Sequence, residues 1–174
     1  MGSLRFLLAM ICLMLAGCAS DPAYSSLNAP ATEASIETPD QPMQCVPYAR
    51  ARSGIDIHGD AALWWDLAAG RYDRSNTPSV GSVLVLTGYA GPARGHVAVV
   101  MAIESDREIR IDHANWFGDG RIYRNDPVVD VSPENDWSAV RVWDTRDNVL
   151  GSRTYVVRGF IVPKHDDPRI ASRE

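Results

Sequence analysis

The sequence lacks the features of a nucleic-acid-binding, fibrous or multidomain protein. It has no cluster of lysine and arginine, and 17 basic against 22 acidic residues give a net charge of -5, which argues against binding to a phosphate backbone. Its 13 glycines and 11 prolines follow no repeat, which excludes a fibrous or low-complexity chain. Its 174 residues, 45% of them hydrophobic, suffice for one folded domain.

Long apolar runs are also absent. The longest, residues 6–16, follows a basic residue and is too short to span a bilayer as a mature helix, which is typical of a signal peptide. It leads into LAGC at residues 15–18, which resembles the bacterial lipobox, where the cysteine receives a diacylglyceryl group. We expect residues 1–17 to be removed and Cys18 to be lipidated. An ordinary secretory signal with a chance cysteine is the alternative.

The segment after Cys18 is rich in Ser, Ala, Thr and Pro and has no helical or alternating apolar period, so it cannot bury enough surface to offset its ordering entropy. We expect residues 18–43 to be a disordered tether, residues 44–163 to be the folded domain and residues 164–174 to be a polar tail. Ala19 in place of Asp resembles the sorting pattern of outer-membrane lipoproteins. The expected location is therefore the cell envelope, at the periplasmic face of the outer membrane.

Cysteine is scarce, and this makes Cys45 informative. Cys12 lies in the segment expected to be removed and Cys18 would be lipidated, so Cys45 has no disulfide partner and is either a small buried residue or a functional thiol. Pro47 is tolerated in the first turn of a helix and Gly54 can end one, so Cys45 is placed at a helix start. The positive end of a helix favours a thiolate and can bind an oxyanion, which predicts a nucleophile.

Two predicted helices precede a series of predicted strands. The second helix covers residues 60–69, with Asp60 as its N-cap and Gly70 after its end. Apolar patterns between turn residues predict strands at 82–87, 96–103, 108–113, 138–143 and 155–162, with a weaker strand at 121–123. Short connections favour antiparallel pairing. We expect an α+β fold in which the N-terminal helices pack on a five- to six-stranded antiparallel sheet.

Two histidines fall on neighbouring predicted strands. His96 opens one strand and His113 ends the next. Because side chains alternate along a strand, His113 and Asn115 share the buried face while Asp112 points to the other face, where we expect it to be solvated. An antiparallel turn brings both imidazoles to one sheet edge. One could take the proton of Cys45 while the second, or Asn115, holds its orientation.

Several stretches resemble the CHAP family of amidases and peptidases, which are papain-like relatives of the NlpC-type cell-wall hydrolases. They are QCVPYAR, GDAALWWDLA, PSVGSVLVL, GHVAVVMAI and HANW, with YVVRGFIVP resembling the closing strand. The resemblance covers about residues 44–163 and implies a papain-like fold. It also implies that Cys45 is the nucleophile and His96 the general base.

The third position of the site departs from the usual CHAP pattern. The resemblance places His113 where CHAP members commonly have Glu or Asp, although NlpC-type relatives often have His there, and it places the family's following Asn at Asn115. Asp112 is the competing candidate, but strand alternation sends it to the opposite face.

The resemblance implies hydrolysis of an amide bond in peptidoglycan through a thioester acyl-enzyme. The activity would be that of an N-acetylmuramoyl-L-alanine amidase or of a peptide endopeptidase acting on the stem peptide. We expect no cofactor, no metal, no nucleic acid and a monomer attached to the membrane through Cys18. One alternative is a non-catalytic cell-wall-binding lipoprotein. The other is a zinc hydrolase that uses Cys45, His96 and His113, although the sequence has no short ligand pair.

The lipobox predicts that Cys18→Ala releases the protein from the membrane fraction. The tether has no apolar surface that could hold a bilayer, so lipid at Cys18 would supply the attachment. Fractionation and intact mass measure the effect, with the conservative tether change Ser25→Ala as a matched control. Unchanged membrane partition of Cys18→Ala would refute the lipid anchor.

Overall fold

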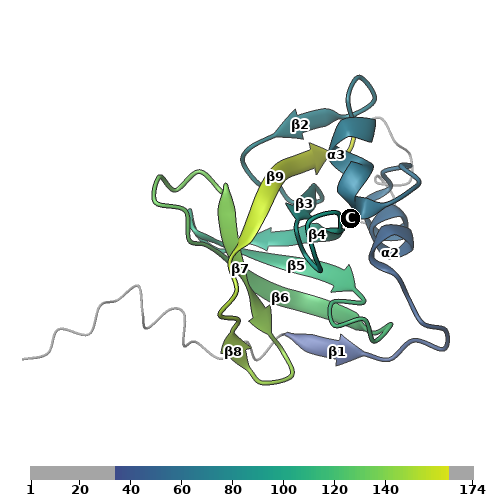
Figure 1. Cartoon of the computed structure of the whole chain (residues 1–174), viewed down its shortest axis with the longest axis vertical. Helices are drawn as coiled ribbons and strands as arrows, with labels where there is room; N and C mark the ends of the chain where they lie inside the picture. Colours follow the sequence, from purple (N-terminus) through teal and green to yellow (C-terminus); the bar gives the residue numbers. More distant parts are fainter. Residues whose placement is uncertain (1–33, 165–174) are drawn as a thin grey trace, which may run out of the picture.

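The computed structural model describes residues 34–164 and contains far more strand than helix (Figure 1). The helical elements are short: α2 (Cys45–Ser53), the 3₁₀ turn η1 (Ala61–Leu63) and α3 (Trp64–Leu67). The strands of this part of the chain are β1 (Ser35–Glu37), β2 (Asp73–Ser75), β3 (Val83–Thr87), β4 (Gly95–Ile103), β5 (Glu108–Ala114), β6 (Ile122–Asp130), β7 (Ala139–Asp144), β8 (Val149–Leu150) and β9 (Tyr155–Val162).

Six antiparallel strands close into a barrel. Strands β3, β4, β5 and β6 are consecutive neighbours, β6 also pairs with β7, β7 pairs with β9, and β9 returns to β3. The expected α+β, papain-like arrangement of N-terminal helices on a five- to six-stranded antiparallel sheet is therefore wrong, because residues 34–164 are mostly β, with a closed barrel and only two short helices. Alternation within a strand shows which side chains are buried, but it does not show whether the two edges of a sheet meet.

Most strand positions agree with the sequence prediction, but β6 is much longer than expected. The sequence predicted only residues 121–123, whereas β6 covers Ile122–Asp130. The middle of β6 consists of residue types that are depleted in strands, namely Asn125, Asp126 and Pro127. For this reason the sequence did not predict the second half of the strand. That half pairs with β7 and so completes the barrel.

The helix boundaries follow local chemistry. Helix α2 begins at Cys45, as expected, and ends at Ser53, where it is followed by Gly54 in a left-handed conformation with φ of 80°. Asp60 caps η1 by accepting a hydrogen bond from the Ala62 N–H. The second helical segment is shorter than the predicted 60–69, because the 3₁₀ turn is followed by only one short α-helix.

The helices lie against the outside of the barrel beside β4 and β5 (Figure 1). Gly95 permits the closest approach: a Cβ atom there would lie 2.5 Å from the Ala62 nitrogen and 2.7 Å from the Ala61 carbonyl carbon. Any side chain at Gly95 would therefore push η1 away from the start of β4. The residue after Gly95 is His96, so the close contact between Gly95 and η1 also fixes the backbone position from which the imidazole extends.

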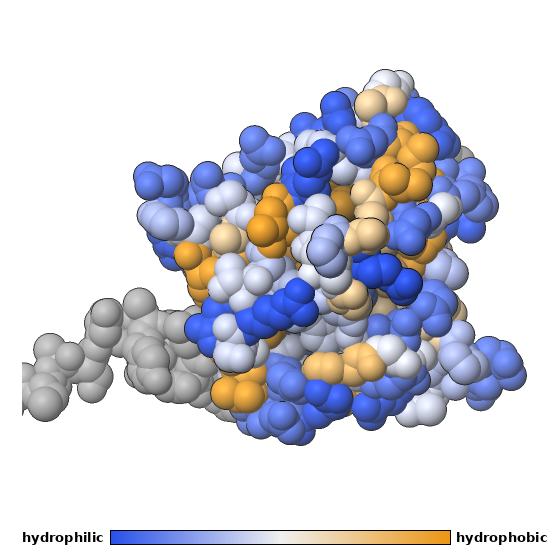
Figure 2. All heavy atoms as spheres, viewed as in Figure 1, coloured by the Kyte–Doolittle hydropathy of each residue, from blue (hydrophilic) through white to orange (hydrophobic). Residues whose placement is uncertain are grey.

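The two larger of three apolar clusters stabilise this arrangement. One fills the barrel and includes Leu86, Ala98 and Phe160. The other lies between the barrel and the helices and includes Val97 and Trp64. Strands β3 and β4 contribute to both clusters, so both of their faces are buried. The hydrophobic surface seen in Figure 2 is divided into small patches by hydrophilic residues.

The described residues before residue 44 include a strand. Residues 35–37 belong to β1 and pair with β6, with Ser35 opposite Arg124, so the tether predicted over residues 18–43 extends too far toward the domain. The expected signal peptide, Cys18 and the tail from residue 165 onward lie outside the described residues. Among residues 34–164, no helix is long and apolar enough to cross a membrane.

Candidate active site

Cys45 lies at the start of α2, next to the first residues of β4. Burial raises the pKa of the Cys45 thiol. Nearby backbone groups of Val97, Val46 and Cys45 itself favour the thiolate and oppose this rise only in part. The sequence predicted a thiolate favoured by the helix start. The buried site instead keeps a thiol that needs a base.

His96 and His113 face each other inside the barrel. Nε2 of His96 lies 3.0 Å from Nδ1 of His113, and Nε2 of His113 lies 3.1 Å from Oδ2 of Asp126. The two imidazoles and the carboxylate are almost completely buried. The structure thus brings the two histidines together as the sequence predicted, and adds a carboxylate behind them.

His96 is held in its neutral form. Burial, and to a smaller extent the neighbouring His113, lower the pKa of His96 well below its ordinary value. Its imidazole is therefore unprotonated at neutral pH and able to accept a proton. Val97, the next residue, contacts the sulfur of Cys45, which puts this base at the same end of β4 as the thiol.

Aromatic rings enclose the two histidines. The rings of Tyr89 and Trp116 each lie 4.9 Å from the His96 ring, and Trp116 lies 5.2 Å from the His113 ring. Burial is the main cause that raises the pKa of Tyr89 to about 12, so its hydroxyl remains protonated. Sequence reasoning missed Tyr89 because it lies in a turn-rich segment that carries no strand or helix pattern.

Asn115 connects the Gln44 side chain with the backbone at Gly120. Its side-chain amide donates a hydrogen bond to Oε1 of Gln44 at 2.8 Å, and its Oδ1 accepts one from the Gly120 N–H. Asn115 has a φ of 60°, a left-handed conformation that asparagine tolerates better than most residues. The sequence predicted that it supports the histidines. The structure instead joins it to the residue before Cys45.

Asp112 has a different environment from the one expected. It points away from the barrel interior, as alternation predicted, but it is only 3% exposed, so the expectation of a solvated carboxylate is wrong. Its Oδ2 accepts hydrogen bonds from Tyr48, Arg52 and Arg124. Helix α2 covers this face of β5. Asp112 therefore attaches α2 to the barrel.

Asp126 is the other residue that sequence reasoning missed. It follows Asn125 and precedes Pro127, in a stretch that resembles a loop more than a strand. Its Oδ1 accepts a hydrogen bond from the hydroxyl of Thr145, and its Oδ2 faces His113. No short-range pattern in the sequence connects Asp126 with His113.

The arrangement does not fit the alternative of a zinc site. His113 uses both ring nitrogens, one for His96 and one for Asp126, which leaves neither for a metal. Across residues 34–164, no three His, Cys, Asp or Glu side chains are grouped so that they could hold a metal ion. The geometry is that of two hydrogen-bonded histidines backed by a carboxylate, with the thiol of Cys45 near Val97 at the same end of β4.

A comparison with known families agrees with this geometry. Residues 37–115 match the family model of the CHAP domain, a family that generally comprises hydrolases of the amidase or peptidase type. The match includes Cys45, His96 and His113 and ends before β6, which carries Asp126. No curated protein matches the chain.

The buried neutral His96 predicts a loss of stability in acid. Below pH about 6.5 the unfolded chain binds a proton at this residue while the folded chain does not, so stability that is present above that pH falls as the pH decreases. The difference in unfolding free energy between wild type and His96→Gln should change by up to about 1.4 kcal/mol per pH unit. Denaturant unfolding from pH 7 to pH 5 measures it. Parallel curves for the two proteins would contradict a buried neutral His96.

Proposed function

Because residues 37–115 belong to the CHAP domain family, we propose that the chain is a cysteine-dependent amide hydrolase that acts on peptidoglycan. The observation that carries the proposal is the hydrogen-bonded pair of His96 and His113, with Val97, the residue after His96, lying next to a thiol at a helix start. The bond cut is either the N-acetylmuramoyl-L-alanine amide or a peptide bond of the stem. Two points support peptidoglycan as the substrate: the expected export to the cell envelope and the match to the CHAP family.

The first half of the reaction forms a thioester. Nε2 of His96 is engaged with His113, so Nδ1 is the nitrogen that accepts the proton of Cys45. The sulfur attacks the carbonyl carbon of the substrate amide. Backbone N–H groups at the start of α2 stabilise the negative charge that develops on the carbonyl oxygen. The C–N bond then breaks, and the leaving amine takes the proton from His96.

The second half of the reaction releases the product. Water attacks the thioester carbonyl while His96 accepts one of its protons. The C–S bond breaks, the sulfur of Cys45 regains the proton, and the carboxylic acid product leaves. Because the pKa of Cys45 is raised and that of His96 is lowered, the resting pair is neutral. Proton transfer from sulfur to imidazole thus accompanies attack.

We place this activity at the periplasmic face of the outer membrane, with lipid on Cys18 as the anchor. The segment between Cys18 and the first described residue, Ala34, has a composition typical of a flexible linker. A linker of that length gives the domain access to polymer close to the lipid surface.

The proposed nucleophile predicts that Cys45→Ser abolishes hydrolysis while the protein remains folded. Serine is nearly isosteric, but its hydroxyl is a far weaker nucleophile with this base, so turnover should fall by at least about 10³-fold. Mass spectrometry of peptidoglycan digests identifies the new termini and hence the bond. EDTA should leave the wild-type activity intact. Loss of activity in EDTA that zinc restores would favour a metal mechanism instead.

The opposite faces of β5 predict different effects for His113 and Asp112. His113→Ala removes the group that orients His96, so kcat should fall at least about tenfold. Asp112→Asn weakens the ion pairs that hold α2, so it should lower the unfolding midpoint while kcat stays within a few-fold of wild type. Both variants need a cooperative unfolding transition before their rates are compared. A larger loss of kcat in Asp112→Asn would assign the third position to Asp112.

A further inference from the structure

We propose that Asp126 is a positioning residue that determines, through His113, which nitrogen of His96 carries the proton. The inference rests on the proposed cysteine mechanism, in which Nδ1 of His96 must be free to accept. Asp126 hydrogen-bonds to His113 and not to His96, so it acts through two hydrogen bonds in series.

A β-bulge turns Asp126 into the barrel. On β5 and β6, Ile111 pairs with Asp126 and His113 pairs with Tyr123. Asp112 alone therefore stands opposite two residues of β6, Arg124 and Asn125. The extra residue is accommodated at Asn125, which has a φ of 54°. Bulges of this kind redirect the side chains that follow them.

The bulge changes which face of β6 each side chain occupies. Tyr123 and Val128 both belong to the cluster inside the barrel, although strict alternation would put them on opposite faces. Asp126 shares the inner face with Val128 and thereby reaches His113. Without the bulge, Asp126 would lie on the outer face, away from the histidines.

Hydrogen-bond accounting then determines the tautomers. Thr145 donates to Oδ1 of Asp126, and Oδ2 accepts from Nε2 of His113. A neutral imidazole has one donor and one acceptor nitrogen, so Nδ1 of His113 accepts from Nε2 of His96. Nδ1 of His96 then carries no hydrogen. This is the state that can take the proton of Cys45.

Burial of these side chains makes the alternative placement of the ring protons unfavourable. His113 and Asp126 are fully buried and His96 is only 1% exposed. Buried polar groups need hydrogen-bond partners, and an unpaired donor or acceptor costs about 1 to 3 kcal/mol. Reversing the ring protons would place Nδ1–H of His113 toward His96 and leave Oδ2 of Asp126 without a donor from the ring. The carboxylate therefore selects one tautomer for both rings.

The inference is tested first on the wild-type protein by long-range ¹H–¹⁵N correlation of histidine-labelled chains. His96 and His113 should both carry hydrogen on Nε2 and have an unprotonated Nδ1. The exposed His58 serves as an internal reference. Hydrogen on Nδ1 of either buried histidine would overturn the proposal without any variant.

The second test is Asp126→Asn. Thr145 should keep its hydrogen bond to the oxygen of the new amide, which turns the amide nitrogen toward His113 and requires Nε2 of His113 to accept. Both histidine tautomers should then change to Nδ1–H. Because His96 can no longer accept from Cys45, kcat should fall by at least about 10²-fold, and alkylation of Cys45 by iodoacetamide at pH 7 should slow by at least about tenfold.

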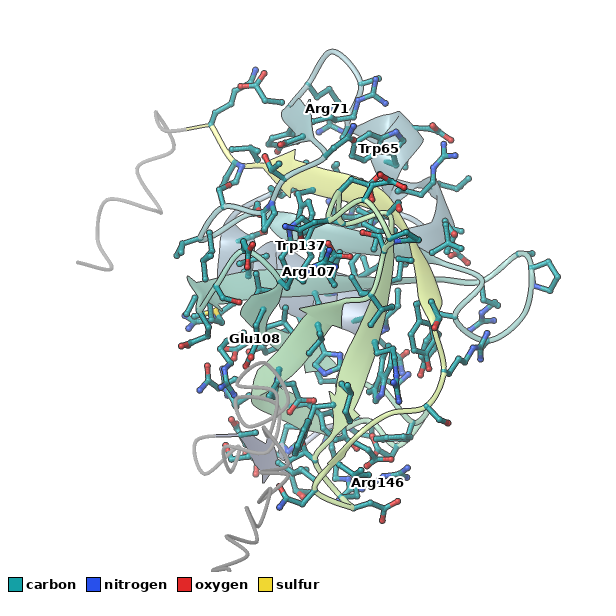
Figure 3. The ribbon with its side chains drawn as sticks, turned by 90° about the vertical axis from the view of Figure 1, so that its left-hand side faces the viewer. Trp65, Arg71, Arg107, Glu108, Trp137 and Arg146 are labelled. Carbon is teal, nitrogen blue, oxygen red and sulfur yellow. The ribbon has the colours of Figure 1, made fainter. Side chains whose placement is uncertain are left out.

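Asp130→Asn is the matched control. Asp130 is on the same strand, is 2% exposed, and accepts hydrogen bonds from the Ser132 hydroxyl and the Trp137 N–H. Its backbone oxygen accepts a hydrogen bond from Arg107 of the turn before β5, so these contacts hold the loop after β6. Arg107 and Trp137 are labelled in Figure 3. This control should leave both tautomers and the alkylation rate unchanged.

The outcomes separate this inference from the proposed function. Asp126→Asn with both tautomers still at Nε2–H would overturn the positioning role, whatever the hydrolytic activity. If wild-type protein fails to hydrolyse peptidoglycan but the tautomers change in Asp126→Asn, the proposed substrate is wrong and the positioning role stands. The spectra and the alkylation rate require no substrate.

Discussion

Closure of the barrel, through the pairing of β9 with both β3 and β7, is the constraint on which the candidate site depends. A closed barrel has an interior that solvent does not reach from the side, and His96 and His113 project into it. Polar groups placed there must satisfy one another. The histidine pair is consequently ordered by its own hydrogen bonds, and its burial explains why His96 remains an uncharged base.

Strand β5 connects this interior to the helix that carries the thiol. Its inner face presents His113 to His96, while its outer face presents Asp112 to Tyr48 and Arg52 of α2. The two chemically different partners of the reaction, an imidazole and a sulfur, are thus held by opposite sides of a single strand. A rigid strand can maintain their separation with less dependence on loop conformation.

Sequence patterns were sufficient to predict features that depend on residues within one segment. Pro47 and Gly54 bracket α2, and alternation places His113 and Asp112 on opposite faces of β5. Sequence patterns did not predict features that depend on contacts between segments far apart in the sequence. Pairing of β6 with β7 closes the barrel, burial under α2 hides Asp112, and desolvation raises the pKa of Cys45 against the effect of the helix start. None of these can be seen in the residues of one segment.

The bulge at Asn125 makes the interior of the barrel depend on chain length as well as on residue identity. Strand β6 pairs with β1 before the bulge and with β7 after it, so the extra residue separates two regions of pairing. Deleting one residue there would keep the other residues of the strand in the same order and exchange the inner and outer faces of those that follow. Related chains that keep every polar residue but differ by one position in this strand would therefore have a different cavity lining. An alignment that treats such a gap as neutral would overlook the difference.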